Sequence, residues 1–410
     1  MARIIETELT FNLSAYFSEM GRKGGESTSA AKTNASRENG MKGGRPRKIL
    51  ADAFYPEKKD ARWRGEPIRA ISLFSGAGGL DLGFHRAGVK IVWANDYSAS
   101  ACETYRANFG SDIQCGSITD YDYKSLPDCD LVIGGPPCQG FSVAGKMDPA
   151  DPRSRMVFEF QNVVAAKRPA VFVMENVAAL ARLAKFAAIR EALLSKYSQM
   201  GYRVRFNVLD SSHYDTPQKR ERMIMIGTRI PGADIRFPEE SPATITARAA
   251  LSHLDAAGTG NNQGICRARI TIAKHPVLRK SPYAGMLFNG LGRPLDLDKP
   301  AQTLPASMGG NKTPILDERW LADPTAGDWV TTYHAALVGG NPVAVAAKTD
   351  VPPTLRRLTV SEAACLQGFP NGFVFKGAQS EKFRQIGNSV PPPFAYRIAE
   401  CVLSSLFDAA

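Results

Sequence analysis

Residues 69–227 alternate short apolar runs with amphipathic segments of helical length, and this alternation restricts the fold more than any other feature. The apolar runs predict strands at residues 70–74, 90–95, 113–115, 131–133, 170–174, 204–210 and 223–227. The segments between them predict helices at residues 80–87, 98–108, 157–167 and 186–200. Strands that alternate with helices form a mostly parallel sheet with right-handed crossovers. The sequence therefore predicts a doubly wound α/β fold.

Composition divides the chain into four parts. Residues 1–65 are basic and rich in glycine, and they are either an arm that contacts DNA phosphates or a solvated tail. Residues 66–229 form the α/β domain. Residues 230–354 lose the alternation and predict a smaller, irregular domain. Residues 355–410 predict a return to the first domain, so the smaller domain is an insertion before the C-terminal helix.

The last part carries two helix signals. Thr359 with Glu362 three residues later forms a capping box, which predicts a helix at residues 359–367. Pro392 stands in the first turn of a final helix expected at residues 392–406.

Charge and cysteine usage restrict the partners. The formal net charge is +11, which suits a polyanionic partner. The chain has no apolar run of 18 residues and no signal-peptide pattern, so we expect a cytoplasmic protein without a membrane span. The seven cysteines form no Cys-x-x-Cys and the five histidines show no ligand spacing, so we expect neither a metal site nor a disulfide framework.

A cysteine follows the predicted strand at residues 131–133. Two glycines and two prolines end this strand, and Cys138 comes directly after Pro137. The two prolines fix two backbone φ angles and thereby stiffen the support of the thiol. Open α/β sheets bind their ligands at the carboxyl ends of the strands, which is where this thiol is expected. A lone cysteine more often packs as a small apolar residue.

Glycines and an acid follow the first two strands. The turn Phe74-Ser75-Gly76-Ala77-Gly78-Gly79 lets the backbone approach a ligand closely, although a plain tight turn is the alternative. Asp96 ends the second strand, where its carboxylate can accept hydrogen bonds from ribose hydroxyls or cap the next helix. The turn alone does not distinguish NAD from S-adenosylmethionine.

Polar side chains also stand near two later strands. Glu175 ends the strand at residues 170–174 and is either an exposed loop residue or part of a site. Gln218, Arg220 and Arg222 alternate along an expected extended segment, so their side chains point to one face. Three convergent donors suit an anion or the polar edge of a base, whereas an ordinary solvated strand start is the alternative.

These stretches resemble the motifs of the DNA cytosine-5 methyltransferases of bacterial restriction-modification systems. Pro-Pro-Cys-Gln-Gly-Phe-Ser at residues 136–142 is similar to the catalytic motif, and the glycine-rich turn, Glu-Asn-Val and Gln-x-Arg-x-Arg match others. Leu355 to Pro370 and Gln385 to Pro392 resemble the two last motifs. All six occur in the family's order, which implies a Rossmann-like methyltransferase fold and a target-recognition domain at residues 230–354.

The resemblance implies a mechanism on cytosine. Cys138 would add to carbon 6, while Glu175 supplies a proton to the ring nitrogen between the carbonyl and the amine. Arg220 would hold the carbonyl oxygen, and Arg220 or Arg222 would favour the thiolate. Loss of the carbon-5 proton then expels the cysteine; the base is unidentified, and water is a candidate. The target cytosine must leave the DNA stack.

The resemblance also assigns ligand contacts. S-adenosyl-L-methionine would be bound by Phe74, Gly76, Gly78, Gly79, Asp96, Tyr97, Ile118, Pro137, Asn388 and Ser389. Many relatives carry an acid where this chain has Ser117, so the contact to the adenine amine is in question. Residues 140–155 suit a lid over double-stranded DNA. The expected DNA contacts are Gln139, Ser142, Lys146, Arg153, Arg155 and Gln218.

Three other functions are alternatives. Amino-methylating enzymes carry Pro-Pro-Tyr, whereas this chain has Pro-Pro-Cys. An RNA cytosine methyltransferase shares the motif set, but the long irregular region better suits a duplex. A non-catalytic DNA-binding regulator would not need Cys138, Glu175 and Arg220 together. By analogy with the family we expect a monomer with a restriction endonuclease as its partner.

Overall fold

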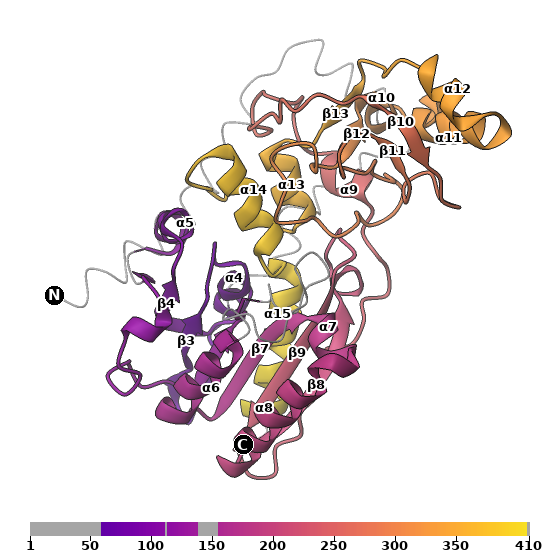
Figure 1. Ribbon diagram of the computed structural model, residues 1–410. Helices are drawn as coiled ribbons and strands as arrows, with labels where there is room; N and C mark the ends of the chain where they lie inside the picture. The colour runs from indigo at the N-terminus through magenta and orange to yellow at the C-terminus, as the bar shows by residue number, and fades with distance from the viewer. Residues whose placement is uncertain (1–58, 111–112, 138–154, 408–410) are drawn as a thin grey trace.

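The computed structural model describes residues 59–110, 113–137 and 155–407 (Figure 1). A seven-stranded sheet with the strand order β5-β4-β3-β6-β7-β9-β8 forms its centre. Its strands are β3 (Arg69–Leu73), β4 (Lys90–Asp96), β5 (Ile113–Cys115), β6 (Leu131–Gly134), β7 (Val171–Val177), β8 (Arg203–Asp210) and β9 (Glu221–Thr228). All seven predicted strands are therefore present.

The sheet is mostly parallel, as predicted, with one antiparallel strand. β9 runs antiparallel to both of its neighbours, β7 and β8. The connection from β8 to β9, residues 211–220, is shorter than the dozen or so residues that a parallel crossover needs. β9 therefore turns back beside β8 and fills the place next to β7.

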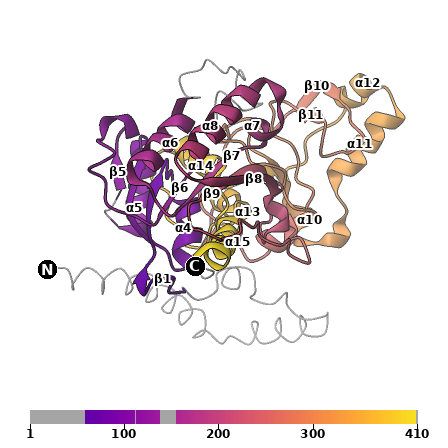
Figure 2. The same ribbon diagram turned by 90° about the horizontal axis from the view of Figure 1, so that it is seen from below.

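Helices cover both faces of the sheet (Figure 2). One face packs on α4 (Gly79–Arg86) and α15 (Pro392–Val402), and the other packs on α6 (Met156–Lys167) and α8 (Ala187–Gln199). Side chains alternate between the faces, as the strand period requires: Ala70 joins the first layer and Ile71 the second. The edge strand β5 and its neighbour β4 pack on α5 (Ala99–Phe109). The doubly wound prediction is confirmed.

Shorter elements complete this part of the molecule. They are β1 (Arg62–Trp63), β2 (Glu66–Pro67), α7 (Ala178–Arg182) and single 3₁₀ turns at Ile118–Asp120, Ala184–Phe186 and Ser211–His213. The final helix, expected over residues 392–406, ends as an α-helix at Val402 and continues as one π-helical turn, Leu403–Phe407.

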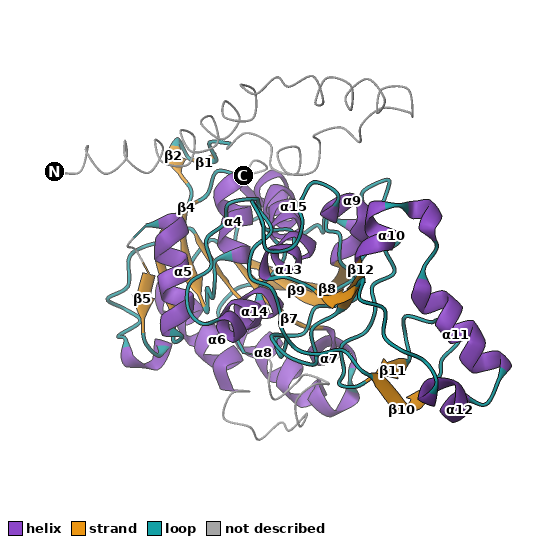
Figure 3. Ribbon diagram, turned by 90° about the horizontal axis from the view of Figure 1, so that it is seen from above, coloured by secondary structure: helices purple, strands orange, loops and turns teal. Residues whose placement is uncertain are grey.

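The smaller domain contains more regular structure than the sequence predicts (Figure 3). Its strands pair as two ladders, β10 with β11 and β12 with β13, and β13 lies just past the predicted boundary at residue 354. The elements are α9 (Ala247–Leu251), β10 (Ile272–Val277), β11 (Met286–Phe288), β12 (Ile315–Asp317), α10 (Glu318–Ala322), a 3₁₀ turn Pro324–Ala326, α11 (Trp329–Gly339), α12 (Pro342–Ala347) and β13 (Leu355–Arg357). α11 and α12 lie in a stretch without charged residues from 329 to 347, which hides the usual amphipathic period.

Two helices lead from the small domain back to the sheet, α13 (Val360–Leu366) and α14 (Gln379–Asn388). The capping box that begins α13 is confirmed: Thr359 Oγ1 accepts from the Glu362 amide, and the Glu362 carboxylate accepts from the Thr359 amide. α14 was not predicted. Among the described residues, we find no helix that combines the length and the apolar character needed to cross a bilayer.

Candidate active site

Three adjacent strands, β6, β7 and β9, carry the residues expected to act on the base. β6 ends at Gly134, and the segment leading to the predicted nucleophile follows it. Asn176 on β7 donates from Nδ2 to the carbonyl oxygen of Pro136 at 3.2 Å, and its Oδ1 accepts from the Val177 amide. The Asn176 side chain therefore ties the segment before Cys138 to β7. Cys138, Gln139, Ser142, Lys146 and Arg153 lie outside the described residues.

Glu175 lies within β7 rather than at its end, and it is largely buried. Arg222 on β9 donates from Nε to Glu175 Oε1 at 2.9 Å, and both side chains are at most 15% exposed. Gly135 brings the backbone close to this carboxylate, because a Cβ added there would lie 3.1 Å from Glu175 Oε2. A charge-assisted hydrogen bond sheltered from water is strong and holds both groups in place. Glu175 and Arg222 thus form one unit beside the residue that precedes Pro136.

Within the described residues, Arg220 bonds backbone groups outside this unit, and its role in holding the base stays a prediction. Its guanidinium donates to the carbonyl oxygens of Gly387 at 2.9 Å and of Leu304 at 3.4 Å, and the residue is 2% exposed. The prediction assumed one extended strand, but β9 begins only at Glu221. Arg220 therefore joins the small domain to the C-terminal part, and Arg222 takes the place beside Glu175.

Gln218 is fully buried and its amide bonds other parts of the chain, so its contact with DNA stays a prediction. Its Nε2 donates to Gln367 Oε1 at 2.6 Å, and its Oε1 accepts from the Leu304 amide at 3.1 Å. Residue 218 pairs as an isolated bridge with Ala301 in the small domain. Its amide is a structural link between the two parts of the molecule.

The glycine-rich turn between β3 and α4 has a sharply bent backbone. Phe74, Gly76 and Gly78 have φ angles of 56°, 55° and 86°. The Gly76 amide donates to Asp96 Oδ2 at 2.9 Å. A Cβ added at Gly76 would meet no atom within 4 Å, so open space lies beside the turn. This is the arrangement expected of a turn that a ligand approaches closely.

Asp96 is nearly buried, and desolvation raises the pKa of its carboxyl group. Besides Gly76, it accepts from the Ser98 amide at 2.8 Å. The N-cap of α5 is Ser98, so the carboxylate fixes the residue at the cap rather than capping the helix itself. The next residue, Tyr97, is 71% exposed and presents its ring to solvent.

Two of the predicted cofactor stretches meet although they are far apart in sequence. A Cβ added at Gly79 would lie 2.3 Å from the carbonyl oxygen of Val390 and 3.2 Å from Ser389 Cβ. Only glycine allows the start of α4 to approach the end of α14 this closely. Ser389 is nearly buried and donates from Oγ to the Gln385 carbonyl oxygen at 2.7 Å, whereas Asn388 ends α14 and is exposed.

The remaining residues that were predicted to contact a ligand differ in how deeply they are buried. Ile118 is buried, and Ser117 caps the 3₁₀ turn through its hydroxyl, with Asp120 accepting from the Ser117 amide at 3.2 Å. Arg155 is exposed at the start of α6. The sequence does not indicate a role for Asn176, because its partner is the backbone of Pro136 in the segment after another strand.

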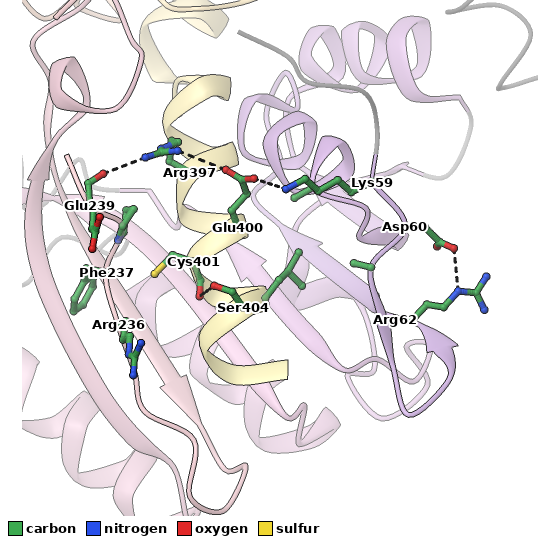
Figure 4. Close-up of a pocket in the computed structure, with 14 residues that line it drawn as sticks. Lys59, Asp60, Arg62, Arg236, Phe237, Glu239, Arg397, Glu400, Cys401 and Ser404 are labelled. Atoms are coloured by element: carbon green, nitrogen blue, oxygen red, sulfur yellow. Dashed lines mark hydrogen bonds and ion pairs between the residues drawn. The ribbon is translucent and has the colours of Figure 1, made fainter. Parts of the chain in front are cut away.

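A separate pocket of about 710 Å³ lies at the opposite, amino-terminal ends of the parallel strands (Figure 4). Residues 59–62, residues 236–239 and the end of α15 line it. Lys59 and Arg397 both form ion pairs with Glu400 there, at 2.6 and 3.8 Å. It contains none of the predicted site residues.

Comparisons with known proteins identify relatives of this chain. A sequence model of the C-5 cytosine-specific DNA methylase family matches residues 68–404. The type II methyltransferase M.NgoFVII of Neisseria gonorrhoeae is 32% identical over 367 residues, covering 83% of this chain and 87% of the relative. The type II methyltransferase M1.HphI of Haemophilus parahaemolyticus is 34% identical over 348 residues, covering 81% and 86%.

Solved structures show the same fold at lower identity. The S. pombe Dnmt2 methyltransferase aligns with a TM-score of 0.55 at 19% identity, covering 82% of this chain and 98% of that one. The Entamoeba histolytica methyltransferase EhMeth aligns with a TM-score of 0.56 at 17% identity, covering 83% and 98%.

Proposed function

Because this chain belongs to the C-5 cytosine-specific DNA methylase family, we propose that it methylates carbon 5 of a cytosine within a specific double-stranded DNA site. S-adenosyl-L-methionine is the proposed methyl donor. The observation that carries the proposal is the Glu175–Arg222 pair, held beside Gly135 in the segment that leads directly to Cys138. The type II names of the relatives support a role in restriction-modification, with a restriction endonuclease as the proposed partner.

The thiol and the carboxyl group have complementary roles. Carbon 5 of cytosine is a poor nucleophile until a bond forms between the Cys138 sulfur and carbon 6. For this step the Glu175 carboxyl group must carry a proton when the base is bound. As the sulfur–carbon bond opens the ring double bond, that proton passes to the ring nitrogen, Glu175 becomes the carboxylate that Arg222 neutralises, and the electron pair becomes available at carbon 5. After methylation, loss of the carbon-5 proton to a base restores the double bond and breaks the sulfur–carbon bond. Water is the candidate for this base.

Arg222 replaces Arg220 in this scheme. Its Nε hydrogen-bonds Glu175 and its Nη1 donates to the Glu221 carbonyl oxygen at 2.7 Å, so Nη2 is the donor best placed to hold the carbonyl oxygen of the same base. The target cytosine must leave the duplex to reach these groups, which costs a few kcal/mol that contacts in the pocket offset.

The cofactor site fits the group that the family implies. Asp96 and the bent turn at Gly76 stand beside open space, and Gly79 and Ser389 close the other side. When bound there, S-adenosyl-L-methionine supplies an electrophilic methyl group. Tyr97 offers an exposed ring and Ile118 a buried apolar side chain for the adenine.

DNA contacts are proposed for the small domain. Exposed basic residues there form no ion pairs within the described parts of the chain, which leaves them available for phosphates. They are Arg267, Arg269, Lys274, Arg279 and Lys280.

Bisulfite sequencing of DNA from cells that express the chain tests the proposed function. We expect one short sequence to acquire protected cytosines at a single position, and we expect Cys138→Ala to abolish the protection. DNA without any new protected cytosine, from cells that contain the folded wild-type protein, would contradict the proposal.

A further inference from the structure

Asp81 is a buried carboxyl group that the proposed chemistry leaves without a role. It lies in the first turn of α4 and has no exposed surface. No ion pair involving it is found among residues 59–110, 113–137 and 155–407. A carboxylate buried in this way is costly unless hydrogen bonds satisfy both of its oxygens. Desolvation accordingly raises the pKa of Asp81 to about 6.

Two hydroxyl groups satisfy these oxygens. Ser72 Oγ on β3 donates to Asp81 Oδ1 at 2.7 Å, and Tyr105 Oη on α5 donates to Oδ2 at 2.7 Å. Hydrogen bonds from hydroxyls to a carboxylate at this distance are among the stronger ones in proteins. A single side chain therefore joins the strand before the glycine-rich turn, the helix after it and the helix beyond β4.

The same network extends into the turn. Ser75 Oγ donates to Ser72 Oγ at 2.9 Å, and the Ser75 carbonyl oxygen accepts from the Gly78 amide at 2.8 Å. The rings of Phe109 and Tyr105 both lie against Gly78, because a Cβ added there would be 2.3 Å from Phe109 Cε2 and 3.1 Å from Tyr105 Cδ2. The turn thus contacts Phe109 and also the ring of Tyr105, whose hydroxyl binds Asp81 and which packs on Phe109 with ring centroids 4.5 Å apart.

The backbone of the turn needs such support. Phe74 is not a glycine, yet its φ of 56° lies in the left-handed region, which residues with a Cβ avoid. A conformation of this kind persists only when its surroundings enforce it. Asp96 holds Gly76 on one side of the turn, and the network of Ser72, Asp81 and Tyr105 underlies the other.

We propose that Ser72, Asp81 and Tyr105 are positioning residues that hold the glycine-rich turn in the shape that binds S-adenosyl-L-methionine. This inference rests on the proposed function, since it assumes that the turn binds this cofactor. The network touches the backbone of the turn and not the reacting groups, so it governs the affinity for the cofactor and not the rate of the chemical step.

The variant Tyr105→Phe tests the proposal, because it removes one hydroxyl and keeps the ring beneath Gly78. Loss of a hydrogen bond to a charged group predicts a KM for S-adenosyl-L-methionine raised about tenfold. The kcat at saturating cofactor should stay within about twofold, since uniform binding affects KM alone. Calorimetric titration with S-adenosyl-L-methionine should show the same loss of affinity.

Tyr123→Phe is the matched control. Tyr123 Oη donates to Glu159 Oε2 at 2.6 Å, so the same type of bond is lost away from the turn. We expect a comparable decrease in Tm with an unchanged KM. Equal KM values for Tyr105→Phe and the wild type, or equal increases in both variants, would overturn the inference. A wild-type protein that binds no S-adenosyl-L-methionine would overturn the proposed function instead.

A double-mutant cycle tests whether the network acts as one unit. The hydroxyls of Ser72 and Tyr105 share one carboxylate, so we expect Ser72→Ala combined with Tyr105→Phe to raise KM by less than the product of the single effects. Fully multiplicative effects would show two independent bonds and contradict a common role through Asp81.

Discussion

Two buried carboxyl groups lie near the carboxyl ends of the parallel strands, and the hydrogen bonds to their oxygens come from different kinds of partner. Glu175 on β7 is paired with a cation, the guanidinium of Arg222 on the next strand. Asp81 on α4 receives two neutral hydroxyls and no cation among the described residues. Both arrangements satisfy the oxygens, but only the first compensates the charge. This difference matches the two proposed roles: Glu175 exchanges a proton with the substrate, and Asp81 holds the glycine-rich turn.

The largest expected effect comes from replacing Glu175, the acid of the Glu175–Arg222 pair. Glu175→Gln keeps the shape and a hydrogen-bond acceptor for Arg222, but the amide cannot donate a proton as an acid does. We expect kcat to fall about 10²- to 10⁴-fold, with the affinity for S-adenosyl-L-methionine unchanged within about twofold. Steady-state kinetics and titration measure both. A kcat near that of the wild type would show that Glu175 is not the proton donor, and its proposed role would then no longer differ from that of Asp81.

Substitutions of Arg222 and Arg220 should likewise have different effects, one mainly on kcat and the other mainly on Tm. In Arg222→Lys the planar donor beside Glu175 is lost, so we expect kcat to fall at least about tenfold. Arg220→Lys weakens the bonds to Gly387 and Leu304. There we expect a lower Tm and a smaller change in kcat. The opposite ranking would restore Arg220 as the base-binding residue.

Asp81 predicts a pH dependence of stability. Its pKa in the folded state, about 6, lies above the ordinary 3.8, so the folded protein holds this proton more tightly than the unfolded chain. The resulting stability is complete below about pH 4 and is lost as the pH rises through 6. At about 1.4 kcal/mol per pKa unit, the loss is about 3 kcal/mol. Tyr105 donates to this carboxyl group, and the charge of Asp96 acts on it as well.

Denaturant unfolding of the wild type and of Asp81→Asn between pH 4 and pH 7 measures this loss. The unfolding free energy of the wild type relative to the variant should decrease over that range. A constant difference would show that burial does not perturb Asp81.

The smallest expected effect is at the end of the hydroxyl chain. Ser75→Ala removes the bond to Ser72 but leaves both bonds to Asp81. A single neutral hydrogen bond contributes about 1 kcal/mol, so we expect KM for S-adenosyl-L-methionine to rise at most about fivefold. A larger effect than that of Tyr105→Phe would place the main support of the turn at Ser75.

The sequence predicts the sheet well because each strand is a short apolar run bounded by turn residues, and β5 (Ile113–Cys115) has the expected bounds. It also places Glu175 and Asp96 near strand ends, since residue order and the strand period are local properties. The partner of each side chain depends on contacts across the chain. Arg220 was expected at the base but binds Gly387, which is 167 residues away.

In the small domain, the sequence pattern did not predict the helices α11 and α12. α11 and α12 carry no charges and therefore lack a polar face in sequence, yet Asp328 and Asn341 cap them through two backbone amides each. The network of Asp81 was also missed, because an acid in the first turn of a helix is usually assigned to the helix dipole. Only the packing of α5 against the turn reveals its partners.

Covalent trapping tests the central claim most directly. In a duplex that carries the recognised site with 5-fluorocytosine at the target position, the carbon-5 proton is replaced, so the enzyme cannot be expelled after methylation. We expect a protein–DNA adduct that survives denaturing electrophoresis, requires S-adenosyl-L-methionine and is absent with Cys138→Ala. A methylating wild-type enzyme that leaves no adduct, or an adduct that persists in Cys138→Ala, would contradict the account.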